Sequence, residues 1–148
     1  MPFSVRISGT DFMEHSPSTP QWTIDDSVNL ALRLSDMGVD IIDVSAAANN
    51  PLQQIPMDDA FYQVKLAHAV RKALKREGKN MLVAAVGKIE SAAMAEGVLS
   101  EGKADVVLVA KQFLRNPNLV RTWAEELGVE MEWPRQYVRL ANKPMGTL

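Results

Sequence analysis

The sequence contains no cysteine, only two histidines and no long apolar run. The absence of cysteine excludes a disulfide framework, a zinc site built on thiolates and a cysteine nucleophile. The apolar runs are strand-sized, far below the roughly 20 residues that a transmembrane helix needs. The net charge of −2 and the lack of a basic cluster interleaved with aromatic residues argue against a nucleic-acid-binding surface.

The N-terminal sequence MPFSVRISGTDF has neither the long apolar core nor the small-residue cleavage site of a secretory signal. It predicts a strand from residue 3 instead of a leader. The length of 148 residues is that of one domain with a real core. We therefore expect a cytoplasmic protein that binds neither nucleic acid nor membrane.

Glycine follows a helix-like segment four times, as is typical of a residue that closes the last helical turn in the left-handed conformation. After the first three of these glycines, the next residues form a near-continuous apolar run. These runs are residues 39–45, 80–87 and 104–111, and a fourth run covers residues 2–8. Residues that are apolar at successive positions indicate strands buried on both faces, as in a parallel sheet.

Amphipathic helices are predicted between and after these strands, in residues 23–37, 58–78, 91–102 and 118–128. Thr23, with Asp26 three residues later, resembles a capping box. Ser91 has the character of an N-cap. The carboxylates of Asp58 and Asp59 are better explained by a helix start than by a catalytic pair.

The alternation of strands and helices predicts βαβ units and a parallel sheet with right-handed crossovers. Two α/β architectures fit this order. One is a small doubly wound sheet. The other is half of a (β/α)8 barrel, because four units in about 130 residues are half of the roughly 250 residues that a barrel uses.

In parallel α/β folds the functional residues lie at the carboxyl ends of the strands. Here these residues are Arg6, Ser8, Ser45, Gly87, Lys88, Ala110 and Lys111. Arg6 lies in a strand whose other residues are suited to burial. It therefore either pairs with an acidic residue such as Asp43 or provides a cation for a ligand at the carboxyl edge of the sheet. Gly87 ends one apolar run, and a ligand could approach its backbone closely. Lys111 ends another run, where it is either a solvated strand end or a phosphate contact beside a helix start.

The histidines and the long loop are weaker candidates for a functional site. His15 lies in a proline-rich loop and His68 in the middle of a helix, so a metal site and a Ser-His-Asp triad are not expected. The segment 45–59 is a long neutral loop bounded by proline, and loops of that length in compact α/β units often cover a ligand.

Together, SVRIS, GVDIIDVS, AAVGKI, KADVVLVAKQFLRNP and WPRQYVR resemble the C-terminal half of the old yellow enzyme family. The resemblance is closer to its bacterial-type branch of NAD(P)H:flavin oxidoreductases. It implies a (β/α)8 barrel that binds FMN, uses NADH or NADPH as electron donor and reduces activated C=C bonds of small enone-like substrates. Residues 1–128 would then form strands five to eight of the barrel with their helices, and residues 129–148 a C-terminal tail.

The resemblance also implies roles for individual residues. Arg6 matches an arginine that reaches the flavin ring and stabilises negative charge on the reduced flavin. Gly87 matches a glycine near the FMN phosphate, and Ala110 and Lys111 match a Gly-Arg pair that holds this phosphate. Arg139 matches an arginine that reaches the active site of the partner subunit.

This chain departs from the family at two points. Lysine at position 111 can pair with phosphate as a point charge but lacks the bidentate fork of arginine, and Ala110 narrows the room for backbone approach. The family's substrate-binding histidine pair and proton-donating tyrosine belong to the N-terminal half, so no catalytic residue is identified here.

A half barrel has open sheet edges and an exposed inner face. We expect it to self-associate as a homo-oligomer, to pair with a separate N-terminal half, or to be a fragment of a longer chain. Two other functions remain open at this point. The chain could be a non-catalytic half barrel that binds a phosphate-bearing ligand or nothing, or a doubly wound binding domain unrelated to flavins.

Overall fold

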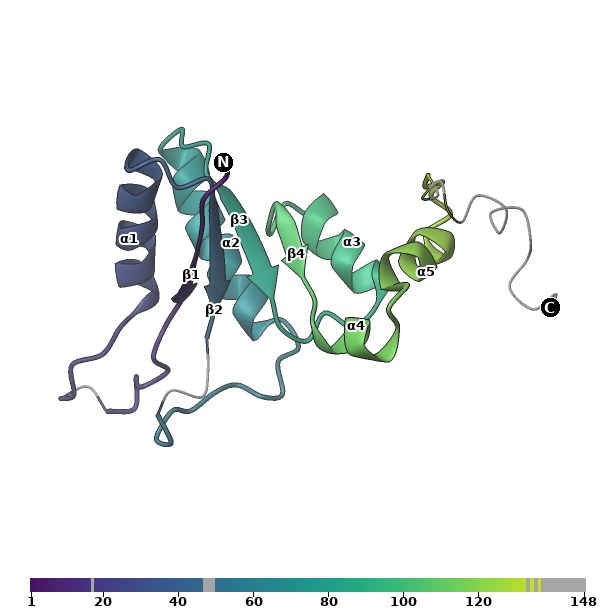
Figure 1. The fold of residues 1–148 in the computed structure, drawn as a ribbon. Coiled ribbons are helices and arrows are strands. Elements are labelled where there is room, and N and C mark those ends of the chain that lie inside the picture. The colour runs from purple at the N-terminus through teal and green to yellow at the C-terminus, as the bar shows by residue number, and fades with distance from the viewer. Residues whose placement is uncertain (17, 47–49, 133, 135, 137–148) are drawn as a thin grey trace.

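The computed structural model of the chain describes residues 1–148 except 17, 47–49, 133, 135 and 137–148 (Figure 1). Strands and helices alternate as expected from the sequence. The elements are β1 (Ser4–Ser8), α1 (Ile24–Asp36), β2 (Ile41–Ser45), α2 (Tyr62–Arg76), β3 (Leu82–Val86), α3 (Ala92–Ser100), β4 (Val106–Leu108), α4 (Lys111–Arg115) and α5 (Leu119–Glu126).

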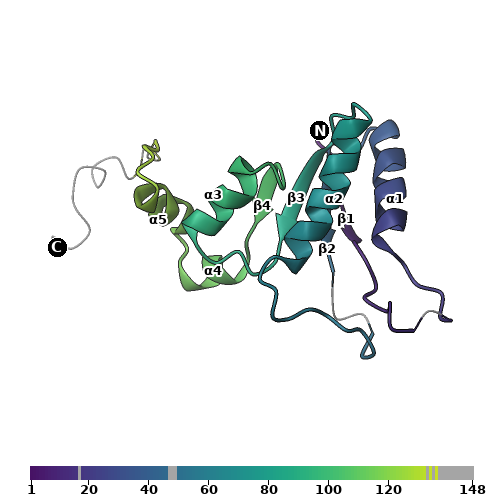
Figure 2. The ribbon, with the colours of Figure 1, turned by 180° about the vertical axis from the view of Figure 1, so that it is seen from behind.

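The four strands form one parallel sheet in the order β1-β2-β3-β4. A doubly wound sheet reverses its strand order at a switch point, and this sheet has no such reversal. The strands lie in front of α2 in Figure 1, and α2 lies in front of them after the half-turn of Figure 2. The sheet is therefore wound in one direction, as neighbouring units of a (β/α)8 barrel are, and the doubly wound alternative is wrong.

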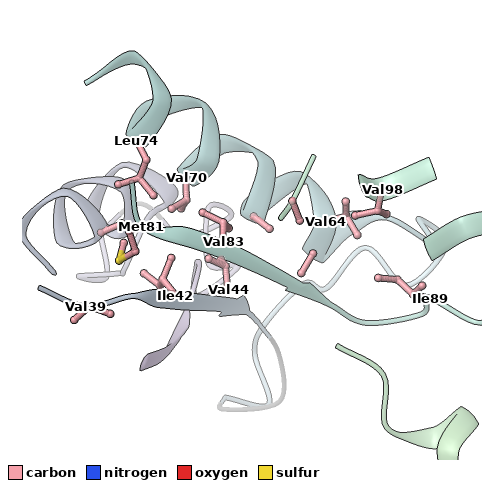
Figure 3. Packing of buried hydrophobic residues seen from close by; sticks show 14 of the residues in the cluster. Val39, Ile42, Val44, Val64, Val70, Leu74, Met81, Val83, Ile89 and Val98 are labelled. Atoms are coloured by element: carbon pink, nitrogen blue, oxygen red, sulfur yellow. The ribbon is translucent and has the colours of Figure 1, made fainter. Parts of the chain in front are cut away.

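One hydrophobic core lies between the sheet and the helices. Ile42, Val44 and Val83 are fully buried on the helix-facing side of their strands. Val64 and Val70 of α2 pack on them, as Figure 3 shows. Side chains from α1 and α3 belong to the same cluster, so these three helices cover a single face of the sheet.

The opposite face of the sheet, called the open face below, is the one that α1, α2 and α3 do not cover. Arg6, Asp43, Ala84 and Val106 are in register across the four strands and therefore share this face. Leu82, on the same face, is 43% exposed. Asp43 and Ala84 are nevertheless buried on this face, at 5% and 1% exposed, whereas Arg6 is exposed. Burial of the strands on both faces, which their composition predicts, is thus complete on the helix-facing side and only partial on the other.

The helix ends follow the local signals of the sequence. The Thr23 side chain accepts a hydrogen bond from the Asp26 N–H, and the Asp26 side chain accepts one from the Thr23 N–H, which confirms the capping box. The Ser91 side chain accepts from the Met94 N–H and caps α3. The glycines after α1, α2, α3 and α5 all have positive φ, as expected for left-handed helix ends.

Two boundaries differ from the sequence prediction. The last strand ends at Leu108, and Lys111 already opens α4, so the apolar run 104–111 is longer than the strand it contains. The helix expected in residues 58–78 begins at Tyr62, because the Asp59 side chain accepts a hydrogen bond from the Phe61 N–H in a turn before it. Across the described residues, no helix is long and apolar enough to cross a membrane.

Candidate functional site

A cleft of about 320 Å³ lies at the carboxyl ends of β3 and β4. The start of α2 and the loop before it close one side of this cleft. Its lining consists of Met57, Tyr62, Gln63, Val86, Gly87, Lys88, Ile89, Glu90, Leu108, Val109, Ala110, Lys111 and Gln112. Gly87, Ala110 and Lys111, which were predicted from the sequence to contribute to one site, therefore line a common cleft.

The charged residues of the cleft favour an anion. Lys88 and Lys111 are cations, and Glu90 is the one carboxylate among the lining residues, so the lining carries a formal charge of +1. No group of three or more metal-ligating side chains occurs in the part of the chain that the structure describes. The cleft is thus suited to a small anionic group, with its charge supplied by lysine side chains.

Gly87 is required by its conformation and by its neighbour Gln63. Its φ is +99°, a region that residues with a Cβ rarely adopt. A Cβ at this position would overlap the side-chain amide of Gln63. The Gln63 amide is itself held in place, because it donates to the Tyr62 hydroxyl over 2.9 Å and accepts from the Ala46 N–H over 3.2 Å.

Lys88, the next residue, also has an unusual backbone conformation, with φ +54°. A non-glycine residue in this region is strained, and such residues gather at functional sites. The ammonium group of Lys88 donates to the Met57 carbonyl and lies 5.8 Å from the centre of the Tyr62 ring. These contacts hold the ammonium beside the cleft and tie the loop before α2 to the end of β3.

Ala110 and Lys111 form the other wall of the cleft. Ala110 is the N-cap of α4 and has negative φ, so its backbone does not require glycine. Its carbonyl accepts hydrogen bonds from the N–H groups of Phe113 and Leu114. Because α4 has only five residues, its dipole is small, and the positive charge of this wall comes from the exposed Lys111 side chain.

Arg6 does not line the cleft. Its guanidinium pairs with Asp43 of the neighbouring strand, the partner that the sequence suggested. Asp43 is 5% exposed, whereas the Arg6 side chain is 60% exposed on the open face of the sheet. Two strand spacings separate β1 from β3, about 10 Å, so a ligand that touches both Arg6 and the cleft must extend across the open face.

The structure adds Gln63 to the site and gives Lys88 a more specific place in it. Lys88 was expected only as a strand-end residue beside Gly87, and nothing in its local sequence signals its contacts with Met57 and Tyr62. Gln63 lies 24 positions before Gly87, and only the fold brings the two together. Arg139 lies outside the described residues.

Comparison with known proteins gives consistent matches. Residues 3–130 match the sequence model of the NADH:flavin oxidoreductase / NADH oxidase family. The chain is 40% identical to an NADH:flavin oxidoreductase from Gibberella zeae, in an alignment of 141 positions that covers 91% of this chain and 33% of that protein.

Two bacterial relatives are named NADPH dehydrogenase. The protein from Bacillus pumilus is 36% identical over 93% of this chain and 37% of its own length. The protein from Bacillus cytotoxicus is 38% identical over 99% of this chain and 39% of its own length. The chain therefore spans little more than a third of the length of these relatives.

Proposed function

Because the chain belongs to the NADH:flavin oxidoreductase / NADH oxidase family, we propose that it forms the phosphate-binding side of an FMN-dependent oxidoreductase. The cofactor of the family is FMN, and NADH or NADPH provides the electrons. The observation that carries the proposal is the cleft at the ends of β3 and β4, where Gly87, Ala110 and Lys111 meet. These residues are the ones that the resemblance to the old yellow enzyme family relates to the FMN phosphate.

The residues of the cleft fit a phosphate group in charge and in shape. Lys111 supplies a positive charge on an exposed side chain, and a lysine binds phosphate as a point charge. Gly87 adds backbone without a side chain at the wall of the cleft. In this assignment Ala110 and Lys111, which follow β4, bind the phosphate on one side, and Gly87, which follows β3, binds it on the other.

Arg6 would act at the other end of the cofactor. Its guanidinium, fixed by Asp43 and exposed on the open face, can be directed at the electron-rich edge of a flavin ring. A cation there stabilises negative charge on the reduced ring. When bound, the flavin supplies hydride transfer between NAD(P)H and a substrate, which we propose to be an activated C=C bond in a small enone-like molecule.

Catalysis by the whole protein needs more than this chain provides. We propose that residues 1–128 correspond to strands five to eight of a (β/α)8 barrel, with residues 129–148 as a tail from which Arg139 reaches a partner subunit. The open face and the two free sheet edges, β1 and β4, would be covered by an N-terminal half barrel or by a second copy of the chain. The complete enzyme would work in the cytoplasm.

A non-catalytic function is the alternative. The cleft and the open sheet face are equally compatible with a self-associating half barrel that binds a phosphate-bearing ligand without turnover. The two functions differ in what the purified chain retains. An FMN-binding chain is yellow, whereas a chain that serves only for assembly is colourless and ignores added FMN.

The visible spectrum and the mass in solution of the purified chain test the proposal. We expect flavin bands near unit occupancy, and Lys111→Ala should weaken FMN retention. Lys72→Ala is the matched control, because Lys72 is an exposed lysine on α2 that lies about 15 Å along the helix from Tyr62. Arg6→Ala should change mainly the redox potential of the flavin. A colourless dimer that does not take up FMN would refute the proposal for this chain.

A further inference from the structure

Lys88 has no role in the function proposed above, although it lines the same cleft. We infer that Lys88 is a second phosphate-binding cation, held in position before the ligand arrives, and that it acts together with Lys111. This inference rests on the proposed function, since it takes the phosphate group of FMN as the ligand of the cleft.

The charge of the ligand favours a second cation. A phosphate monoester carries about −1.5 to −2 charges near neutral pH. Lys111 alone, opposed by Glu90, leaves the lining without net charge. Lys88 brings the formal charge of the lining to +1. An anionic ligand in the cleft would interact favourably with both lysines.

The contacts of Lys88 leave its ammonium group able to bind. A lysine ammonium has three N–H donors. The Met57 carbonyl accepts a hydrogen bond from one of them, and the centre of the Tyr62 ring lies 5.8 Å from the ammonium nitrogen. The remaining donors are available to an anion in the cleft. Because Met57 and Tyr62 already limit the motion of the side chain, less conformational entropy is lost on binding than for a free surface lysine.

The backbone at position 88 supports the same role. A lysine at φ +54° costs stability that glycine or asparagine would not cost. A purely structural link between the end of β3 and the loop at Met57 would not depend on a ligand. Phosphate binding explains why a charged residue occupies the strained position. It also predicts that substitutions of Lys88 lower the affinity for FMN, which a purely structural link does not predict.

The affinities of the full chain for FMN and for riboflavin, which lacks the phosphate, test the inference. The ratio of the affinity for FMN to the affinity for riboflavin isolates the contribution of the phosphate. Both affinities can be measured by quenching of flavin fluorescence. We expect Lys88→Ala to lower the ratio about tenfold, which corresponds to about 1.4 kcal/mol. Lys88→Arg should retain most of it, and the control Lys72→Ala should leave it unchanged.

Two further variants separate charge from structure. Lys88→Gly relieves the backbone strain, so its melting temperature should be no lower than that of Lys88→Ala, while its ratio is equally reduced. Glu90→Gln removes the opposing carboxylate and should raise the ratio.

The outcomes distinguish this inference from the proposed function. In one outcome the unmodified chain prefers FMN to riboflavin, Lys111→Ala removes this preference and Lys88→Ala retains it. Lys88 is then a structural residue, and only the inference fails. If the unmodified chain binds both flavins equally or not at all, the phosphate site itself is refuted. Reduced ratios for Lys88→Ala and Lys111→Ala, with the Lys72→Ala ratio unchanged, support both.

Discussion

Replacement of Asp105 by alanine tests what fixes the short strand β4, whose end carries one wall of the cleft. Asp105 precedes β4 and accepts a hydrogen bond from Arg71 of α2 over 2.9 Å. Its other carboxylate oxygen accepts from the Val83 N–H over 3.0 Å, and its own N–H donates to the Val83 carbonyl. The side chain thus connects β4 to β3 and to the helix that covers them.

The expected loss follows from these contacts. The Arg71 and Asp105 side chains are 18% and 20% exposed, so the pair is largely removed from solvent. A hydrogen bond to a charged group contributes about 1.5–3 kcal/mol, and alanine would leave the Val83 N–H and part of the Arg71 guanidinium unpaired. We expect Asp105→Ala to lower the free energy of unfolding by about 2–3 kcal/mol, below the cost of about 3–5 kcal/mol for a fully buried pair.

Urea denaturation followed by circular dichroism measures this loss. Glu77→Ala is the control, because the pair between Arg76 and Glu77 is exposed, with side chains 71% and 48% accessible. That pair should contribute no more than about 1 kcal/mol. Asp105→Asn keeps an acceptor for the Val83 N–H and should fall between the two. An Asp105→Ala protein as stable as the control would show that Arg71 and Asp105 do not fix β4.

Three further predictions concern Gly87, the titration of Asp105 and the pair between Arg6 and Asp43. Gly87→Ala should destabilise the chain by about 1–2 kcal/mol in thermal melts, from the left-handed backbone and the displaced Gln63; if the Gln63 clash contributes, Gly87→Ala should cost less in a Gln63→Ala background. Burial raises the pKa of Asp105, but hydrogen bonds from Arg71 and Val83 outweigh it and lower the pKa below its usual value. The stability this provides is therefore complete above about pH 4 and lost as the pH falls through the folded-state pKa, and acid titration of Asp105→Asn should lack this component. A double-mutant cycle of Arg6→Ala and Asp43→Ala in urea should give a coupling of about 1–2 kcal/mol, since Asp43 is buried; additive losses would contradict the pair.

Much of the fold could be predicted because its signals are local. A glycine that closes a helix and an apolar run after it are enough to place three of the four parallel strands, and β1 follows from its apolar run alone. The caps at Thr23 and Ser91 also depend on residues within one helical turn. The winding of the sheet could not be read in this way. A singly wound and a doubly wound sheet share the same local pattern, and only the strand order distinguishes them.

The meeting of Gly87, Ala110 and Lys111 at one cleft could be predicted, because every parallel strand has its carboxyl end on the same edge of the sheet. The other contacts of the cleft could not be predicted, and the binding of FMN phosphate there stays a prediction. Gln63 and Met57 approach from α2 and the loop before it, at sequence separations that no short motif spans. Lys88 could be placed at a strand end from the sequence, but its contact with Met57 depends on a left-handed backbone that its own sequence does not favour, so this contact could be assigned only from the structure.

This chain contains more of the proposed phosphate end of the cofactor site than of the proposed flavin-ring end. The cleft is built from β3, β4, α2 and the loops between them, and all its lining residues are described. Arg6, by contrast, stands on the open face of the edge strand β1, with 60% of its side chain exposed. Phosphate recognition can therefore be complete in the isolated chain, while the environment of a flavin ring cannot. For this reason the preference for FMN over riboflavin is a fairer measure of the site than turnover, because it reports the end of the cofactor for which the chain supplies the walls.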